Sequence, residues 1–165
     1  WQFAKMQYSA QLHGWTRFIS MQDHYNLLMR EEEREMLPFC LDQGIGVLPW
    51  SPVARGKLTR PLGVHTPRQD TDMLTRAGMY TRNQESDAAI VQAVQRIAEA
   101  RGVPMVQVAL AWVMAQPAVT SPIVGVTKLT HLDDPIAAIE LKLTEEEIAE
   151  LDTPYTPRMP EGYPS

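Results

Sequence analysis

A short apolar run, Ile45–Trp50, ends in a large aromatic residue and leads directly into a loop of small and basic residues, Ser51–Lys57. A run of that length after Gly44 predicts a buried strand. The loop at its carboxyl end offers a close-approaching backbone and cations that suit phosphate. Because ligands of α/β proteins bind at the carboxyl ends of parallel strands, the segment favours a nucleotide site. An ordinary strand followed by a basic turn fits the same composition equally well.

The residues before this strand predict a β-α-β unit. Phe18–Gln22 is a second strand candidate. Glu31–Gln43 is expected to be helical in two pieces, because Pro38 is disfavoured in the middle of a helix. Gly44 ends the helix, and the next strand begins at once. Such a short turn predicts a parallel pair of strands joined by a right-handed crossover.

The rest of the chain alternates helical and extended patterns. Residues 51–85 form a long irregular stretch, which in a compact domain is usually functional or mobile. The proline-rich residues 153–165 are expected to form an extended arm over the surface. Ser86 and Thr144 are expected N-caps. A third strand is predicted at Ser121–Val126. Further helices are predicted at Gln2–Leu12 (stopped by Gly14), from Ser86 to Gly102, from Pro104 through Val113, from Leu129 to Ile139, and from Thr144 to Leu151. In the helix from Leu129 to Ile139, the residues expected to face the core are Leu129, Leu132, Ile136 and Ile139.

Strands that alternate with helices predict an α/β fold. Three strands cannot close a barrel, which takes eight strands and at least about 200 residues. The opening helix has no strand before it to receive its apolar face. We therefore expect residues 1–165 to be a single partial domain, the rear portion of a longer protein.

Composition argues against several classes of partner. The net charge is −5 and no Lys/Arg cluster exceeds two or three residues, so no nucleic acid is expected. No apolar run approaches the ~18 residues of a membrane span, so no membrane is expected either. Cys40 is the single cysteine, which rules out an internal disulfide and favours a cytoplasmic location. The four histidines show no spacing that suits a metal.

Four motifs follow one another along the chain: Met21–Leu28, Arg30–Pro38, Trp50–Gly56 and Pro122–Lys128. Together they resemble the aldo-keto reductases, most closely the bacterial branch related to the potassium-channel β subunits. The resemblance covers essentially the whole chain. It implies the C-terminal half of a (β/α)8 TIM barrel, with strands six to eight and their helices. It also implies NADP(H)-dependent reduction of aldehydes or ketones to alcohols.

By this resemblance, the cofactor lies across the carboxyl ends of the strands. Gln22 would hydrogen-bond the nicotinamide carboxamide, and the ring of Trp50 would stack on the nicotinamide. Arg68 or Arg60 would close over the pyrophosphate from the 51–85 cofactor-side loop. The pyrophosphate would be wrapped by the backbone of Ser51, Pro52, Val53, Ala54, Arg55 and Gly56, with Lys57 as a counter-charge, and the adenosine and 2′-phosphate segment would be Gly125, Thr127, Lys128, His131 and Asp134.

The resemblance also implies a catalytic Asp, Tyr, Lys and His in the first half of the barrel, and nothing in this chain matches them. Hydride transfer needs a proton donor for the developing alkoxide, so this chain alone is expected to be inactive. The expected partners are a small aldehyde or ketone and the N-terminal half of the barrel, as a companion chain or an unseen segment. His24 and Tyr25 look like an acid/base pair, but the resemblance assigns them to a loop on the substrate side.

Two other interpretations stay open at the level of the sequence. The chain could be a non-catalytic NADP(H)-binding regulatory subunit, with partner contacts on the 51–85 loop. It could also be an inactive truncated fragment. Aldehyde-dependent NADPH oxidation separates the reductase from the regulatory subunit, and a cooperative unfolding transition separates both from the fragment.

The cofactor segment departs from the family at three positions. His131 stands where Arg or Gln is usual, Asp134 where Glu is usual, and Pro135 where Asn is usual. A largely neutral imidazole is a poorer partner for a 2′-phosphate than a guanidinium. We therefore expect a weakened preference for NADPH over NADH. Dissociation constants measured side by side should be similar, and a preference for NADPH of about a hundredfold would contradict the prediction.

Overall fold

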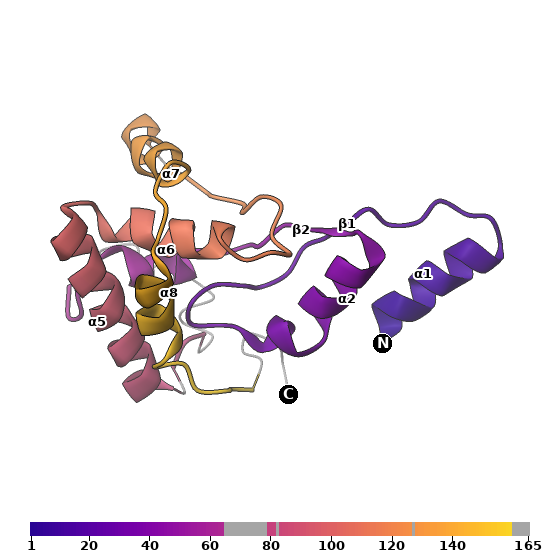
Figure 1. The fold of residues 1–165 in the computed structure, drawn as a ribbon, viewed down its shortest axis with the longest axis horizontal. Helices are drawn as coiled ribbons and strands as arrows, with labels where there is room; N and C mark the ends of the chain where they lie inside the picture. The colour runs from indigo at the N-terminus through magenta and orange to yellow at the C-terminus, as the bar shows by residue number, and fades with distance from the viewer. Residues whose placement is uncertain (65–78, 82, 127, 160–165) are drawn as a thin grey trace.

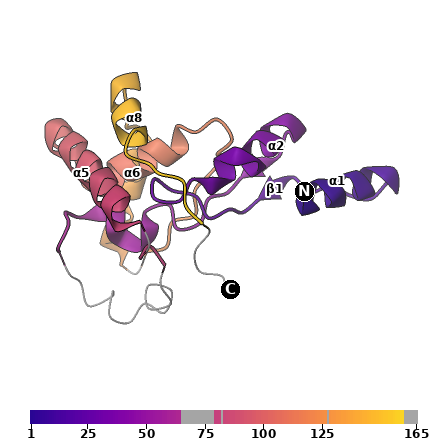
Figure 2. The same ribbon diagram turned by 90° about the horizontal axis from the view of Figure 1, so that it is seen from below.

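The computed structural model describes residues 1–64, 79–81, 83–126 and 128–159. Figure 1 shows two groups of helices joined by a short sheet. The view from below keeps this division, with α1 projecting away from α5, α6 and α8 (Figure 2). One group holds α1 (Gln2–Leu12) and α2 (Met36–Gln43), and the other holds α5 (Gln84–Arg101), α6 (Met105–Met114) and α8 (Glu145–Asp152).

The sheet is parallel and follows the order of the chain. Strand β1 (Ser20–Met21) pairs with β2 (Gly46–Val47), with their first residues opposite each other. Single bridges extend the pairing from Trp50 to His24 on one side and to Ile123 on the other. Within the described residues, three parallel segments therefore lie side by side, as expected for an α/β fold.

The strands are shorter than predicted. The expected strands Phe18–Gln22 and Ile45–Trp50 keep two ladder residues each, and Ser121–Val126 contributes only the bridge at Ile123. In the described part of the chain, β1 has a neighbour on one side only, so its ladder ends early. Pro122 lacks the N–H group that a longer third strand would donate.

The helix ends follow from cap chemistry. Thr144 and Glu147 form the reciprocal hydrogen bonds of a capping box at the start of α8, as predicted. A break at Glu35 divides the predicted helix 31–43 into the 3-10 helix η1 (Glu31–Arg34) and α2. Left-handed glycines, which have no Cβ to clash, follow α1, α2 and α5: Gly14, Gly44 and Gly102.

The described part of the predicted C-terminal arm, residues 153–159, is anchored into the structure. The hydroxyl of Ser86 donates to the carbonyl of Pro154 at 2.8 Å. Ser86 was expected to cap α5, but the helix already begins at Gln84, so the serine is free to bond the arm. The guanidinium of Arg158 is buried and pairs with Asp87 of α5 at 2.5 Å. The arm is therefore tied to α5 rather than only draped over the surface.

Helices α5 and α6 supply much of the buried apolar surface. Trp112 is fully buried, as its place in a helical stripe predicts. Cys40 is buried in α2, and burial raises the pKa of its thiol to about 11, which fits a small inert hydrophobe. No single described helix is long and apolar enough to cross a membrane, and α5 and α6 pass that test only as a pair bent by 107°.

Arg30 connects the first strand segment to the C-terminal part of the chain. Its guanidinium pairs with Glu33 at 2.8 Å and with Asp152 of α8 at 2.7 Å. The rings of Trp112 and Tyr155 lie 4.9 and 5.2 Å from the guanidinium carbon. The cation is therefore held by two carboxylates and two aromatic faces, drawn from η1, α6, α8 and the arm.

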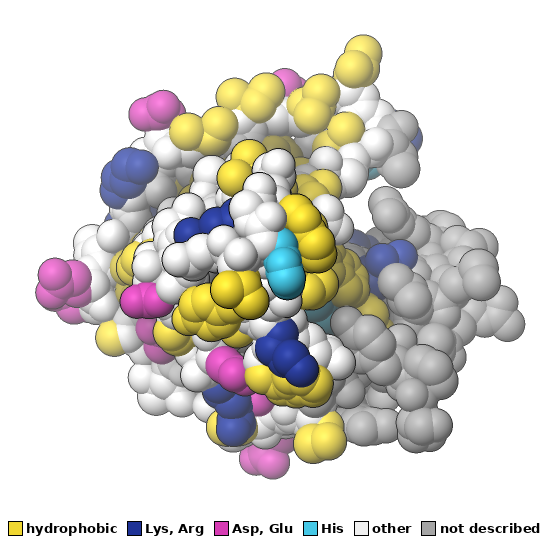
Figure 3. Space-filling model, turned by 90° about the vertical axis from the view of Figure 1, so that its right-hand side faces the viewer, with side chains coloured by type: hydrophobic (Ala, Val, Ile, Leu, Met, Phe, Trp, Pro, Cys, Tyr) yellow, Lys and Arg dark blue, Asp and Glu magenta, His cyan; other side chains and the backbone are white. Residues whose placement is uncertain are grey.

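The apolar stripe that follows the third strand segment was predicted to face the core, and this prediction is wrong: the stripe is exposed. In η3 (Leu129–His131), Leu129 is 84% exposed, and in α7 (Asp133–Ala138), Ile136 is 61% exposed. Leu132 and Ile139 are exposed as well. Helix α7 packs on α6 through its inner side, and no described residue covers its outer side. Figure 3 shows hydrophobic side chains over α7 at the top and over the end that carries α1.

The buried pair of Arg158 and Asp87 yields a stability prediction. Arg158→Met removes the buried guanidinium that pairs with Asp87, so the free energy of unfolding should fall by about 3–5 kcal/mol. The matched control is Arg96→Met, which breaks the more exposed pair with Glu150 and should cost at most about 1 kcal/mol. Urea unfolding measures both, and equal losses in the two variants would contradict the assignment.

Candidate functional site

The carboxyl ends of the three parallel segments meet around Trp50. The Trp50 N–H donates to the carbonyl of Asp23 at 2.8 Å, and the Ile123 N–H donates to the carbonyl of Pro49 at 2.8 Å. Gln22 is exposed on the neighbouring segment. The structure therefore brings Gln22, Trp50 and the start of the Gly125 turn to one edge of the sheet, where ligands of α/β folds bind.

The indole of Trp50 lies flat against an imidazole. The ring centroids of His24 and Trp50 are 4.0 Å apart, with 16° between the ring planes. His24 is 8% exposed, whereas Trp50 is partly exposed. Burial, followed by the positive charges of Arg55 and Arg158, lowers the pKa of His24 to about 4. The imidazole is therefore neutral at physiological pH, and it supports the indole as an uncharged aromatic surface.

The backbone after Trp50 adopts a conformation that side chains normally avoid. Ser51, Ala54 and Arg55 have φ values of 53°, 48° and 55°, and Gly56 has 90°. Ala54, Arg55 and Gly56 are left-handed in succession, and the N–H groups of Ala54 and Gly56 donate to the carbonyls of Ser51 and Val53 at 2.9 Å each. Such strain in non-glycine residues clusters at ligand sites. The predicted phosphate loop is thus strained as well as rich in small residues, a property that its composition did not reveal.

Gly56 is required by the shape of this loop. Its carbonyl accepts hydrogen bonds from Thr59 Oγ1 at 2.9 Å and from Arg60 Nε at 3.1 Å. The positive φ of 90° disfavours any side chain at Gly56, and a Cβ atom there would also displace the tip of the Arg60 guanidinium. The loop continues as the 3-10 helix η2 (Ala54–Thr59), whose Ala54 and Leu58 are fully buried. The packing of these residues holds the strained backbone in place.

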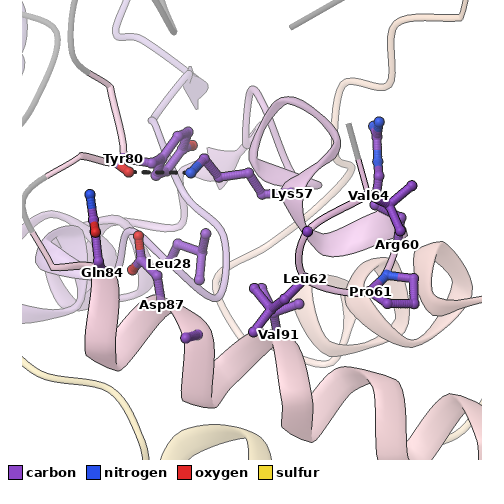
Figure 4. Close-up of a pocket in the computed structure, with 12 residues that line it drawn as sticks. Leu28, Lys57, Arg60, Pro61, Leu62, Val64, Tyr80, Gln84, Asp87 and Val91 are labelled. Atoms are coloured by element: carbon purple, nitrogen blue, oxygen red, sulfur yellow. Dashed lines mark hydrogen bonds between the residues drawn. The ribbon is translucent and has the colours of Figure 1, made fainter. Parts of the chain in front are cut away.

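A pocket of about 310 Å³ opens beside η2 (Figure 4). The ammonium of Lys57 crosses it to the carbonyl of Tyr80, at 3.3 Å. Arg60 lies on the other side of the pocket, and Val91 of α5 forms part of its apolar floor. The two cations predicted near the pyrophosphate are therefore both placed next to the loop, at the rim of a cavity.

The other predicted cofactor residues are placed less completely. Lys128 and His131 are exposed beyond the third strand segment, and Asp134 accepts a hydrogen bond from Gln107 of α6 at 3.0 Å. Thr127 and Arg68 lie outside the described residues. The adenosine and 2′-phosphate role of this segment stays a prediction.

Two buried polar side chains of this edge were not singled out from the sequence. Asp23 is 5% exposed, and burial together with the charge of Glu32 raises the pKa of its carboxyl to about 7. Tyr80 is 1% exposed and reaches the His24 ring from a point far along the chain. An acid inside an apolar strand pattern was a signal for Asp23, whereas no local pattern points from Tyr80 to His24. No group of metal-binding side chains occurs in the described part of the chain.

Comparison with known proteins places these features in a family. A family model described as "Aldo/keto reductase family" matches residues 1–155. Versiconal hemiacetal acetate reductase of Aspergillus parasiticus is 45% identical over 159 residues, which are 96% of this chain and 46% of that protein. An aldo-keto reductase of Alternaria alternata is 41% identical over 163 residues, 98% of this chain and 43% of that protein.

A solved structure of an aldo-keto reductase is also similar to this chain. The crystal structure of a thermostable aldo-keto reductase with the inhibitor epalrestat is similar at a TM-score of 0.56 and 26% sequence identity. The match covers 82% of this chain and 39% of that one. The chain thus spans about half the length of the relatives that it matches.

The raised pKa of Asp23 predicts a pH-dependent stability. An ordinary Asp titrates near pH 4, so between about pH 4 and 7 the folded state keeps a proton that the unfolded state releases. The contribution of Asp23 is fully present below about pH 4 and is lost as the pH rises through about 7. The Asp23→Asn variant, which carries no titrating group there, should therefore become progressively more stable relative to wild type over this range.

Urea unfolding at several pH values measures this difference. The exposed Asp42→Asn variant is the control and should track wild type. A constant difference between Asp23→Asn and wild type from pH 4 to 7 would contradict the raised pKa.

Proposed function

Because the chain belongs to the aldo/keto reductase family, we propose that it supplies the cofactor-binding half of an NADP(H)-dependent oxidoreductase that reduces aldehydes or ketones to alcohols. One observation carries the proposal: a strained, left-handed loop, Ser51–Gly56, directly follows an aromatic ring at the carboxyl end of parallel strands. A stacking surface followed directly by a tight loop that carries the cations Arg55 and Lys57 suits a dinucleotide.

The residues present fit such a cofactor. The nicotinamide would occupy the face of Trp50 opposite His24, with Gln22 bonding its carboxamide. The backbone of Ser51–Gly56 would receive the pyrophosphate, and Lys57 would add a positive charge at the same place. When bound, the cofactor supplies the hydride, and the residues of this chain fix which face of the nicotinamide ring is presented.

The proposal includes a second half of the barrel. The exposed apolar stripe of α7 and the exposed aromatic residues near α1, among them Trp15 and Phe18, support a covering partner. In the complete protein, with this chain as the C-terminal half of a (β/α)8 barrel, the N-terminal half would supply a Tyr that donates the proton, a Lys paired to an Asp that lowers the pKa of this Tyr, and a His that orients the substrate. Binding without aldehyde-dependent NADPH oxidation in the complete protein would favour the regulatory-subunit alternative. With its one cysteine buried, we place the protein in the cytoplasm as part of the same proposal.

Titration of the chain with NADPH tests the cofactor role. Trp50→Ala removes the stacking surface, so the dissociation constant should rise by about tenfold or more. Trp15→Ala is the matched control, because it removes an indole that is 64% exposed and not part of the strand-end cluster. Calorimetry avoids the change in fluorescence that both variants cause. Equal affinity of Trp50→Ala and wild type would contradict the proposed site.

A further inference from the structure

Tyr80 links the far end of the 51–85 loop to the ring system of Trp50. Its hydroxyl lies 2.6 Å from His24 Nε2 and 2.9 Å from Asn26 Nδ2. The side chain is 1% exposed, and its ring meets the His24 ring edge-on, with centroids 5.7 Å apart. The hydrogen bond between Tyr80 and His24 is therefore buried and joins residues 56 positions apart.

The amide of Asn26 determines the direction of its own hydrogen bond to Tyr80. Its Oδ1 accepts the N–H of Leu28 at 2.8 Å, so the amide orientation is fixed. Its Nδ2 then donates one hydrogen to the carbonyl of Ser51 and the other to the hydroxyl oxygen of Tyr80. That oxygen keeps a second lone pair, so the bond runs from the hydroxyl to His24 Nε2 only when the imidazole is the Nδ1–H tautomer. This arrangement requires a neutral imidazole that carries its proton on Nδ1.

The backbone of Tyr80 is held in an unusual conformation that keeps this geometry. Its φ is 61°, which costs a non-glycine residue free energy, and its carbonyl accepts the Lys57 ammonium at 3.3 Å. Tyr80 thus contacts both parts of the proposed cofactor site, the support of the stacking ring and a cation of the phosphate loop. A residue needed only for packing would not require either contact.

We infer that Tyr80 is a positioning residue: its hydroxyl holds the imidazole of His24 flat behind the indole of Trp50 and so sets the surface on which the nicotinamide stacks. This inference rests on the proposed function for its ligand. The hydrogen bond between Tyr80 and His24, called the lock below, exists without a bound ligand. Without the hydroxyl, the imidazole can turn, and the indole loses a fixed support. The cost should therefore appear in cofactor affinity.

The lock is tested first in the protein without cofactor. Long-range ¹H–¹⁵N spectra of the chain report the tautomer and the pKa of each histidine, and His24→Asn assigns the signal. Wild type should show the Nδ1–H tautomer of His24. In Tyr80→Phe the neutral imidazole loses its hydrogen-bond donor, so the pKa of His24 should rise above its wild-type value, while burial and the charges of Arg55 and Arg158 still hold it below the ordinary value. The Nε2–H tautomer in wild type, or an unchanged pKa in the variant, would overturn the lock.

The role in positioning is tested by binding. The NADPH dissociation constant of Tyr80→Phe should rise about three- to tenfold, the usual effect of one lost hydrogen bond. Tyr25→Phe is the matched control, because it removes an equally buried hydroxyl that donates to Glu33 instead. That variant should leave both the His24 spectrum and the affinity unchanged.

Each outcome has one meaning. A shifted His24 pKa with unchanged NADPH affinity would overturn the positioning role and leave the proposed function intact. Equal losses of affinity in Tyr80→Phe and Tyr25→Phe would reduce Tyr80 to a packing residue. A wild-type chain that does not bind NADPH would overturn the proposed function, and the positioning role with it, while the spectra would still decide the lock.

Discussion

The sandwich of Arg30 between Trp112 and Tyr155 is the interaction on which the arrangement of the chain depends. The cation contacts η1 through Glu33, and α8 through Asp152, which also accepts the Trp112 indole N–H. The Tyr155 hydroxyl accepts the main-chain N–H of Arg30 and donates to Glu31. The guanidinium can contact two rings and two carboxylates because it is planar, permanently charged and rich in donors, whereas a lysine could not. The first strand segment, which carries one side of the candidate site, is thereby fixed to the C-terminal helices.

Burial shifts the pKa values of two neighbouring groups at the strand ends in opposite directions. Burial raises the pKa of Asp23 to about 7 and lowers that of His24 to about 4, because desolvation disfavours the charged form of either group. The His24 ring behind Trp50 is therefore uncharged at neutral pH, and Asp23 is only partly ionised. The positive charge of the site comes instead from the loop, through Arg55 and Lys57. This separation suits a ligand with an uncharged ring at one end and phosphates farther along.

The sequence was informative where the relevant contacts are local. The parallel order of the strands, Trp50 at a strand end and the glycine that stops each of three helices all follow from patterns a few residues long. The outer face of α7 was predicted wrongly, because periodicity identifies an apolar stripe without saying whether a neighbour covers it. Ser86 was expected to cap α5 for a similar reason, since its actual partner, Pro154, lies 68 residues away. The hydrogen bond between Tyr80 and His24 joins residues 56 positions apart, so no short window of sequence could contain it.

In the left-handed loop, the residue that would best stabilise the fold differs from the residue that keeps the site rigid. Ala54 is fully buried at a φ of 48°, a conformation that glycine would adopt with less strain. A glycine there would relieve the strain but would widen the range of conformations open to the loop, so that each arriving anion would have to order the loop again. Selection for a more stable chain and selection for a tighter phosphate cradle would therefore favour different residues at this one position.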